Sequence, residues 1–583
     1  MDKQTNQDDV IKRILGYTRP YRLQLMLAFT GATVNVIFTL LIPVIIGKII
    51  DEIIGINHVN FDRIIQKIII LTAVILISSL FQWIMNVSTR KLSSFVSRNM
   101  RNDAFEKLNR VPLKFIDANP HGDIISRLVN DADAVSEGLL QGFTQLFPGV
   151  ATIIGTLVIM LLLNVRIALV VIIVTPLSIV FAGFVTKRTN RYFTRQSELQ
   201  GELSGYINEM VTNKDLVSAF NYQKTCMTEF NRITDDYCEA GFKAVFYSSV
   251  SNPGTRFVNS IVFGCVCVLG AIMIIMGNIS IGQVSAFLTY ANQYTKPFNE
   301  VTSVFTQLQT ALASARRMFH LIDADKEPEI ENPAAILAAQ GNVHIDNISF
   351  RYHPDVPLIE NFKLDVKSGQ RIAIVGPTGC GKTTLINLLM RFYDVDSGDI
   401  RVDDTSIYQI QRKDLRDQYG MVLQETWLKN VTVRENIAYG KPDAAIDEII
   451  AAANSAHAHG FIKRLENGYD TVIAPEGSNL SAGQRQLLCI ARIMLCQPDM
   501  LILDEATSSI DTRTEMLIQQ AFEKLMKGRT SFIVAHRLST IQTADVIIVM
   551  NQGHIIEQGN HQELLAQKGF YYELYNSGLG LGA

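Results

Sequence analysis

The sequence predicts a multi-domain protein in which a six-helix transmembrane bundle with long cytoplasmic helical extensions is followed by a soluble α/β domain. Apolar segments long enough to cross a bilayer recur before about residue 310. From about Val343 onward, short β-like runs alternate with helical patterns. Within that second half, the glycine-rich stretch Gly376–Thr384 separates a strand-like run from a helical one. These observations indicate a membrane part joined to a soluble part.

The composition excludes some classes of protein. A chain of 583 residues is too long for one domain, and 48% of its residues are hydrophobic. With a net charge of −3 it lacks the basic field that collects nucleic-acid phosphates, so no nucleic-acid partner is expected. Its 7 cysteines form no metal-like pair and are expected to be reduced.

The membrane spans are expected where about 20 apolar residues can cross a bilayer of ~30 Å. Runs so long and uniformly apolar are not typical of a soluble helical bundle. The predicted spans are about 22–50, 64–88, 139–163, 167–187, 246–276 and 281–305. Lys and Arg gather before the first span and in the long connections after the second and fourth, so both termini and these connections are expected in the cytoplasm. The sequence thus predicts a multi-pass protein of the cell membrane, in contact with its lipid bilayer.

The two long connections have helical periodicity and many charges, which is typical of helices that extend beyond the membrane. Each has a turn-rich break, at Pro112–Gly122 and at Thr212–Leu216. A short helix there could contact a soluble domain and transmit motion, although a solvated loop is the alternative. Within the fifth span, Arg256 could face a substrate or reach toward the cytoplasmic surface.

The glycine-rich stretch matches the phosphate-binding pattern G-x-x-x-x-G-K-[ST]. It follows the apolar run Arg371–Val375 and reads Gly376, Pro377, Thr378, Gly379, Cys380, Gly381, Lys382, Thr383 and Thr384. Its glycines let successive N–H groups face an anion at a helix N-terminus. Lys382 is expected to reach the β- and γ-phosphates, and the Thr383 hydroxyl to bind Mg²⁺. The second half is therefore predicted to be a P-loop NTPase domain that binds ATP and Mg²⁺; a glycine turn without a ligand is the alternative.

Two carboxylates end a second apolar run, Met500–Asp504, about 120 residues after this loop. Asp504 is placed to hold Mg²⁺ through water, and Glu505 to orient or deprotonate an attacking water. Before this domain, residues 323–340 are acidic and contain prolines, as expected of a linker. The predicted organisation is a transmembrane domain at 1–322, the linker, and a nucleotide-binding domain at 341–583.

The run Asn479–Gln486 resembles the signature motif of ATP-binding cassette (ABC) transporters, commonly LSGGQ. Together with the phosphate loop, the Asp504-Glu505 pair and six preceding spans, it makes the whole chain similar to one half of an ABC exporter of the multidrug and lipid-flippase kind. The resemblance implies roles for further residues. Tyr352 would stack on adenine, Gln424 would sense Mg²⁺ and the attacking water, and His536 would contact the γ-phosphate.

The resemblance also implies a partner chain. The signature residues Ser481, Ala482, Gly483 and Gln484 would bind the nucleotide held by a second half-transporter, and Asp511 belongs to the loop that crosses between the two nucleotide domains. Glu476 would contact the cytoplasmic helical arms. Hydrolysis would then separate the two domains and return the spans to an inward-open state.

Two departures from the pattern bear on that partner. Ala482 replaces a glycine and Leu487 replaces a basic residue. Such drift resembles the glutamate-bearing half of heterodimeric exporters, so a heterodimer is favoured, with a homodimer as the alternative. The expected function is ATP-driven export of small amphipathic substrates such as drugs, lipids or peptides. The alternatives are a homodimeric lipid flippase and a membrane protein regulated by nucleotide without hydrolysis.

Overall fold

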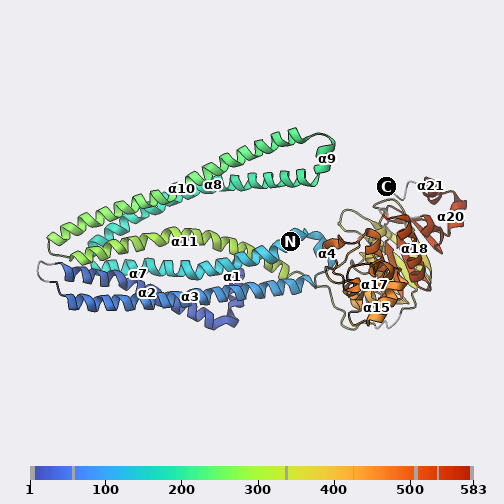
Figure 1. Ribbon diagram of the computed structural model, residues 1–583, viewed down its shortest axis with the longest axis horizontal. Coiled ribbons are helices and arrows are strands. Elements are labelled where there is room, and N and C mark those ends of the chain that lie inside the picture. Colours follow the sequence, from blue (N-terminus) through green and yellow to red (C-terminus); the bar gives the residue numbers. More distant parts are fainter. Residues whose placement is uncertain are drawn as a thin grey trace. The chain divides into compact units, whose positions relative to one another are not determined.

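The computed structural model describes residues 7–54, 59–334, 339–423, 426–504, 510–534 and 538–577. The chain divides into two compact units (Figure 1). The N-terminal unit comprises Met1–Arg110 and Asn119–Ala324, and the C-terminal unit comprises Val111–Ala118 and Asp325–Ala583. A short segment of the first half of the chain therefore folds with the second half.

The described residues of the N-terminal unit form helices of very unequal length. They are α1 (Gln7–Thr18), α2 (Arg22–Ile53), α3 (Phe61–Leu108), α5 (His121–Ser126), α6 (Ala132–Gln141), α7 (Phe147–Leu163), α8 (Val165–Thr212), α9 (Lys214–Ala219), α10 (Gln223–Ile275) and α11 (Ile281–Ile322). Short 3₁₀ or π-helical turns lie at Arg19–Tyr21, Arg127–Asp131 and Gly142–Leu146. At 1.5 Å per residue, the 48 residues of α3 extend about 72 Å, more than twice the ~30 Å of a bilayer core. The apolar segments are therefore parts of much longer helices.

Among the described residues, four stretches are long and apolar enough to cross a membrane: Asp9–Ile53, Phe61–Leu108, His121–Leu163 and Arg256–Ile275. Val165–Pro176 is a shorter apolar helix. The segments predicted at 167–187 and 281–305 lie within α8 and α11. For these two helices the prediction of a span rests on their amino-acid pattern.

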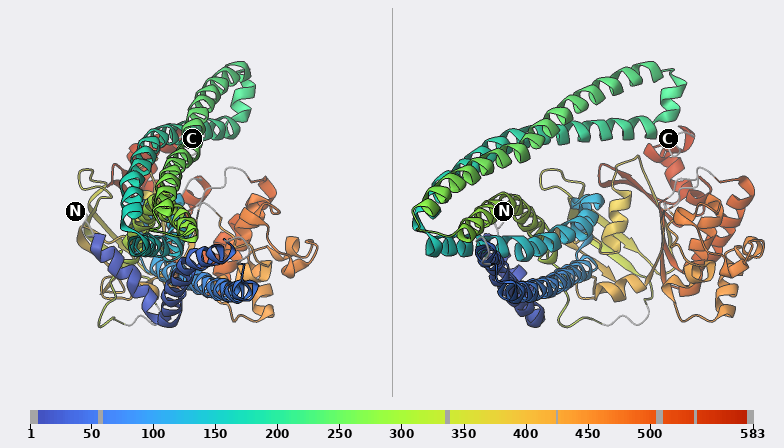
Figure 2. Two further views of the ribbon diagram at one scale, coloured as in Figure 1. Left: turned by 90° about the vertical axis from the view of Figure 1, so that its left-hand side faces the viewer. Right: turned by 60° about the vertical axis from the view of Figure 1, so that its left-hand side comes forward.

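The N-terminal unit is held together by an apolar core and by polar contacts between helix ends. Its core draws side chains from α2, α7, α8, α10 and α11, including Phe287 and Tyr290. The Asp51 carboxylate at the end of α2 accepts hydrogen bonds from Ser280 Oγ and Gly282 N at the start of α11, both at 2.7 Å. The helices α8 and α10 run side by side to α9 at their tip, as both figures show (Figures 1 and 2).

The C-terminal unit combines two sheets with flanking helices (Figure 2). Its described strands are β1 (Val343–Phe350), β2 (Ile359–Val366), β3 (Arg371–Val375), β4 (Ser397–Val402), β5 (Thr405–Ser406), β6 (Tyr419–Val422), β7 (Met500–Asp504), β8 (Thr530–Val534), β9 (Val546–Asn551) and β10 (His554–Gly559). Its described helices are α4 (Leu113–Ala118), α12 (Lys382–Leu389), α13 (Arg412–Asp417), α14 (Val433–Ile437), α15 (Ile446–Ser455), α16 (His459–Ile462), α17 (Ala482–Cys496), α18 (Thr512–Met526), α19 (Leu538–Gln542), α20 (His561–Gln567) and α21 (Phe570–Ser577). The α/β prediction is confirmed.

The strand order places the ends of three parallel strands at one edge. One sheet has the order β2-β1-β4-β5, and the other has the order β10-β9-β3-β8-β7-β6. Alternate residues of β3 enter different cores: Ala373 and Val375 pack on one face, Ile372 and Ile374 on the other. Because β3, β8 and β7 are parallel neighbours, their carboxyl ends meet at one edge of the sheet, where α/β proteins bind ligands.

The short helices predicted at the tips of the two long connections are confirmed. They are α4 and α9. The first folds with the C-terminal unit: Leu113 packs against the core of that unit, and Tyr393 donates a hydrogen bond to the Asp117 carboxylate. The prediction that such a helix can contact a soluble domain is therefore confirmed for α4.

Candidate functional site

The glycine-rich loop between β3 and α12 has the backbone that its sequence requires. Gly376, Gly379 and Gly381 have φ values of +155°, +82° and +105°. A Cβ on Gly376 would lie 2.2 Å from the carbonyl oxygen of Met550, so a side chain does not fit there. A Cβ on Gly379 would meet no atom within 4 Å. The start of the loop therefore packs closely against β9, whereas there is free space beside Gly379.

Lys382 lies at the first position of α12 and turns back over the loop. Its Nζ donates hydrogen bonds to the carbonyl oxygens of Gly376, at 2.7 Å, and Pro377, at 3.0 Å. The side chain is only 9% exposed. The neighbouring Cys380 thiol is buried, and burial raises its pKa, so it stays protonated. The loop therefore encloses one cationic group, while the next residue, Thr383, is exposed.

Asp504 ends β7 at the same sheet edge. It pairs in register with Val534 at the end of β8, and Val534 pairs with Ile374, two residues before the loop. Asp504 is 8% exposed, so it is largely shielded from bulk solvent. This register brings Asp504 and the phosphate loop to one edge. The residues Gln424, Glu505 and His536 lie outside the described residues.

Tyr352 follows β1 and is held by three neighbours. Its ring meets those of Phe350 and Tyr393 almost at right angles, with centroids 4.9 Å and 5.0 Å away. Asn387 Nδ2, on α12, donates a hydrogen bond of 3.2 Å to the Tyr352 hydroxyl. The side chain remains 38% exposed. A fixed ring with accessible surface is therefore attached to the helix that begins at the phosphate loop.

The signature residues lie at the start of α17. Ser481 is the N-cap: its side chain accepts a hydrogen bond from Gln484 N, and the Gln484 side chain accepts one from Ser481 N. Gly483 is buried, and a Cβ there would lie 2.3 Å from Thr514 Cγ2 on α18. Ala482, by contrast, is half-buried. The two small residues of this signature are therefore not equivalent.

Asp511 caps the neighbouring helix α18. Its carboxylate accepts a hydrogen bond from Thr514 N at 3.0 Å. The pKa of Asp511 is held below its usual range mainly by this backbone N–H and, to a smaller extent, by the Thr514 side chain. Asp511 is consequently ionised beside the start of α17.

These two helix starts border a hollow of about 510 Å³. Ser481, Gln484 and Asp511 line it together with several cationic or imidazole side chains, namely His457, His459, Arg464 and Arg513. Of the described residues that line it, none belongs to Gly376–Thr384. The signature thus opens onto a basic surface that its own phosphate loop does not share.

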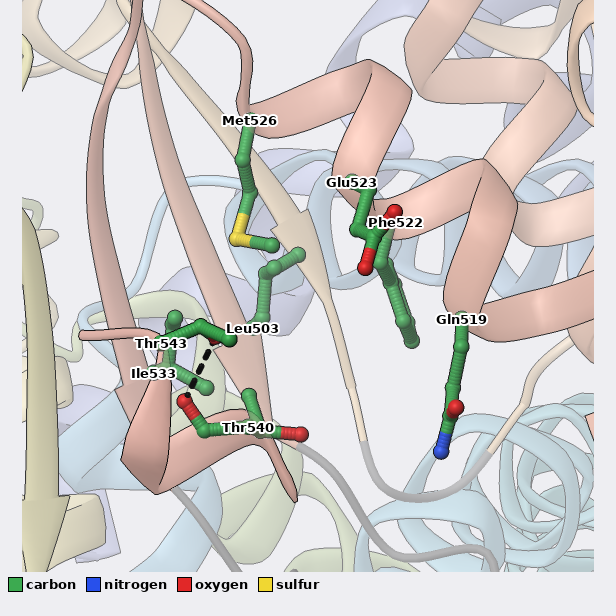
Figure 3. Close-up of a pocket in the computed structure, with 8 residues that line it drawn as sticks. All are labelled: Leu503, Gln519, Phe522, Glu523, Met526, Ile533, Thr540 and Thr543. Atoms are coloured by element: carbon green, nitrogen blue, oxygen red, sulfur yellow. Dashed lines mark hydrogen bonds between the residues drawn. The ribbon is translucent and has the colours of Figure 1, made fainter. Parts of the chain in front are cut away.

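A second cavity of about 140 Å³ lies beside α18 (Figure 3). Its lining is Leu503, Gln519, Phe522, Glu523, Met526, Ile533, Thr540 and Thr543. Thr543 Oγ1 donates a hydrogen bond to the Thr540 carbonyl across one side (Figure 3). The described lining includes neither phosphate-loop nor signature residues.

Sequence reasoning missed the residues that hold Tyr352. Asn387 and Tyr393 carry no motif, and their positions depend on packing between distant segments. A signal for Asn387 was available, because it lies on the helix that follows the phosphate loop. The side chain of Glu476 lies outside the described ones.

The comparisons with known proteins agree with this architecture. Residues 25–298 match the family model of the ABC transporter transmembrane region, and residues 359–508 match that of the ABC transporter. A fatty acid ABC transporter ATP-binding/permease protein of Mycobacterium tuberculosis is 39% identical, covering 88% of this chain and 82% of the relative. An ATP-dependent lipid A-core flippase of Syntrophus aciditrophicus is 34% identical, covering 97% and 94%.

A solved structure is also similar. The structure of a bacterial Atm1-family ABC exporter with ATP bound has a TM-score of 0.78 and 27% identity, and covers 96% of this chain and 98% of that one. One solved structure therefore matches both the long helices and the α/β unit with the phosphate loop that follows them. The chain belongs to the ABC exporters, in which a transmembrane domain is coupled to ATP hydrolysis in the nucleotide-binding domain that follows it.

Proposed function

We propose that this chain is the ATP-hydrolysing half of a two-chain exporter that moves amphipathic molecules outward across the cell membrane. The substrates would be drugs, lipids or peptides taken from the cytoplasm or the inner leaflet. The relatives support this class, because their names give a fatty acid and lipid A-core as the molecules that they move. A fatty acid and a lipid each combine a polar group with apolar hydrocarbon.

The nucleotide would bind between Tyr352 and the phosphate loop. The positive φ values at Gly376, Gly379 and Gly381 suit a loop whose N–H groups face phosphates. Lys382 would exchange its carbonyl partners for the β- and γ-phosphate oxygens. The remaining loop residues, Pro377, Thr378, Cys380 and Thr384, would complete the cradle.

Mg²⁺ fits the residues at this edge. Thr383 is an exposed residue with a hydroxyl group, and Asp504 supplies a carboxylate from the end of β7. Both are oxygen ligands of the kind that Mg²⁺ prefers, with Asp504 acting through water and Gln424 as a further ligand. Bound there, the ion would neutralise charge on the phosphates.

Hydrolysis would depend on Glu505 as the base for the attacking water and on His536 as a contact of the γ-phosphate. Their support is the strand register, because β7 and β8 end at the same edge of the sheet as β3, which leads into the phosphate loop. Replacing Glu505 with Gln should lower ATP turnover by about two to three orders of magnitude, as expected for loss of a general base, while ATP binding is retained. ATPase rates and trapped nucleotide measure the two properties separately. Normal turnover by E505Q would refute the assignment.

The observation that carries the two-chain proposal is the position of the signature. Ser481, Gln484 and Asp511 line a basic hollow that the described phosphate-loop residues of the same chain do not enter. A hollow rich in Arg and His suits the phosphates of a nucleotide bound by another chain. ATP would then join two nucleotide-binding domains, with Gly483 allowing the close packing behind the site.

The partner is proposed to be a different half-transporter. Ala482 is half-buried next to Ser481, and Leu487, only 2% exposed, lines the hollow at a position where the common pattern has a basic residue. Both changes weaken the site that this chain offers to the partner's nucleotide. The test is to purify the chain alone and together with the candidate partner, and to measure ATPase activity and assembly. Robust turnover by a stable homodimer would refute the heterodimer.

A further inference from the structure

Tyr393 connects two features of the C-terminal unit that lie far apart in the sequence. Its ring contacts Tyr352 edge to face, with centroids 5.0 Å apart and planes at 89°. Its hydroxyl donates a hydrogen bond to the Asp117 carboxylate of α4, a helix from the first half of the chain. The Tyr393 side chain thus spans from the candidate adenine-stacking ring to the tip of a cytoplasmic arm.

The orientation of the Tyr352 ring depends on this contact. Phe350 supports the ring from one direction and Tyr393 from another, and the Asn387 amide holds its hydroxyl. Edge-to-face contacts favour a defined angle between rings. A shift of Tyr393 would therefore change the surface that Tyr352 presents.

The position of Tyr393 depends in turn on α4. The residue is 8% exposed, so its hydroxyl needs a partner inside the protein. The pKa of Tyr393 is raised mainly by burial and, to a smaller extent, by the hydrogen bond to Asp117. The hydroxyl therefore remains a donor at neutral pH. A bond from a hydroxyl to a carboxylate is stronger than one between neutral groups. Leu113 packs α4 against the core to which Tyr393 also belongs.

We propose that Tyr393 is a positioning residue for adenine binding, which makes the stacking surface of Tyr352 depend on the docking of α4 through Asp117. This rests on the proposed role of Tyr352 as the adenine-stacking residue. Docked α4 would favour binding of the base, and bound base would favour docking of α4, because coupling between two binding events is reciprocal. The phosphate loop would be unaffected.

The test compares nucleotide with a base-free ligand on the full-length transporter complex. Affinities for MgATP and for magnesium tripolyphosphate are measured for wild type, Tyr393→Phe, Asp117→Ala and the double variant. Each single variant should weaken MgATP about two- to tenfold, the loss expected for one hydrogen bond. Tripolyphosphate affinity should not change, KM for ATP should rise with kcat retained, and the double variant should match the singles.

Two further variants test whether the hydrogen bond between Tyr393 and Asp117 is responsible for the loss of affinity. Asp117→Asn retains an oxygen acceptor and should restore most of the affinity that Asp117→Ala loses. Tyr419→Phe removes a buried hydroxyl that has no hydrogen-bond partner among the described residues, and should leave both affinities unchanged. An equal loss for ATP and tripolyphosphate, or additive losses in the double variant, would overturn the proposal.

Tyr352→Ala separates the two levels of inference. It should weaken MgATP at least as much as the Tyr393 variant. If Tyr352→Ala leaves MgATP affinity unchanged, the adenine-stacking role is wrong and the proposal for Tyr393 fails with it. If Tyr352→Ala weakens ATP while Tyr393→Phe and Asp117→Ala do not, only the link to α4 is refuted.

Discussion

Replacing Gly483 by alanine is expected to disturb packing within the nucleotide-binding domain and not only contact with phosphate. The added Cβ would lie 2.3 Å from Thr514 Cγ2 and 3.2 Å from Ile510 Cγ2. Carbon atoms in contact prefer about 3.5–4.0 Å, so the Thr514 methyl group would have to move away by more than about 1 Å, through a rotamer change or a shift of α18. Overpacking of this kind typically costs about 1–3 kcal/mol.

The corresponding assay is thermal unfolding of the full-length protein in detergent, alongside its ATPase activity. For a domain of 150–250 residues, 1 kcal/mol shifts Tm by about 2–4 °C, so a cost near 2 kcal/mol should lower it by about 4–8 °C. Thr514→Ser removes the clashing methyl group while keeping the backbone N–H that Asp511 accepts. The double variant should therefore recover part of the lost stability.

The matched control is Ala482→Gly, because Ala482 is the neighbouring small residue of the signature and is only half-buried. Its Tm should stay near that of wild type, apart from the modest cost of a helical glycine. The packing explanation would be refuted if Gly483→Ala kept the wild-type Tm and lost only ATPase activity. That result would mean that glycine is needed at position 483 for contact with the phosphate of the partner's nucleotide.

Three other predictions follow from single contacts. Gly282→Ala would place a Cβ 1.9 Å from a carbonyl oxygen of α2 and should lower Tm by several degrees, whereas Gly264→Ala, with no atom within 4 Å, should not. Removing the guanidinium by Arg317→Leu leaves the Asp131 carboxylate, 5% exposed, without its ion pair; Tm should fall by an amount equivalent to about 1–3 kcal/mol, and adding Asp131→Asn should restore part of it. The pKa of Asp511 is lowered in the folded protein, so its contribution to stability is present above the ordinary aspartate pKa and is lost as pH falls through the lowered value. The Tm deficit of Asp511→Ala relative to wild type should therefore be larger at neutral pH than in acid.

Motifs that act through their own backbone could be predicted from the sequence, because a few adjacent residues determine them. The phosphate loop and the cap of α17 are such cases: glycines at positive φ and a Ser N-cap with Gln three residues later are local patterns. The predicted spans were shorter than the helices that contain them. Hydropathy falls where a helix leaves the membrane, but its hydrogen bonds continue, as in α3 and α8.

Contacts between distant segments could not be predicted in the same way. Asp117 and Tyr393 are 276 residues apart, and neither is unusual in its local sequence. Their pairing depends on α4 folding with the C-terminal unit, which periodicity alone does not specify. The same applies to Gly483, whose neighbour Thr514 lies on another helix.

The difference between Ala482 and Gly483 sharpens the inference about the partner chain. A methyl group at position 483 would strike α18, so glycine is required there for the chain's own packing. Position 482 is only half-buried, so part of it stays accessible to the proposed partner. Restoring the common pattern with Ala482→Gly should therefore tighten binding of the nucleotide held by the partner and leave the phosphate loop of this chain unaffected. In a two-chain assembly, that asymmetry can be measured by combining Ala482→Gly with Lys382→Ala, which disables this chain's own loop: ATP binding that tightens under those conditions must come from the partner's site. If ATP binding does not change, Ala482 is not what weakens the site shared with the partner, and the heterodimer proposal loses one of its two supports.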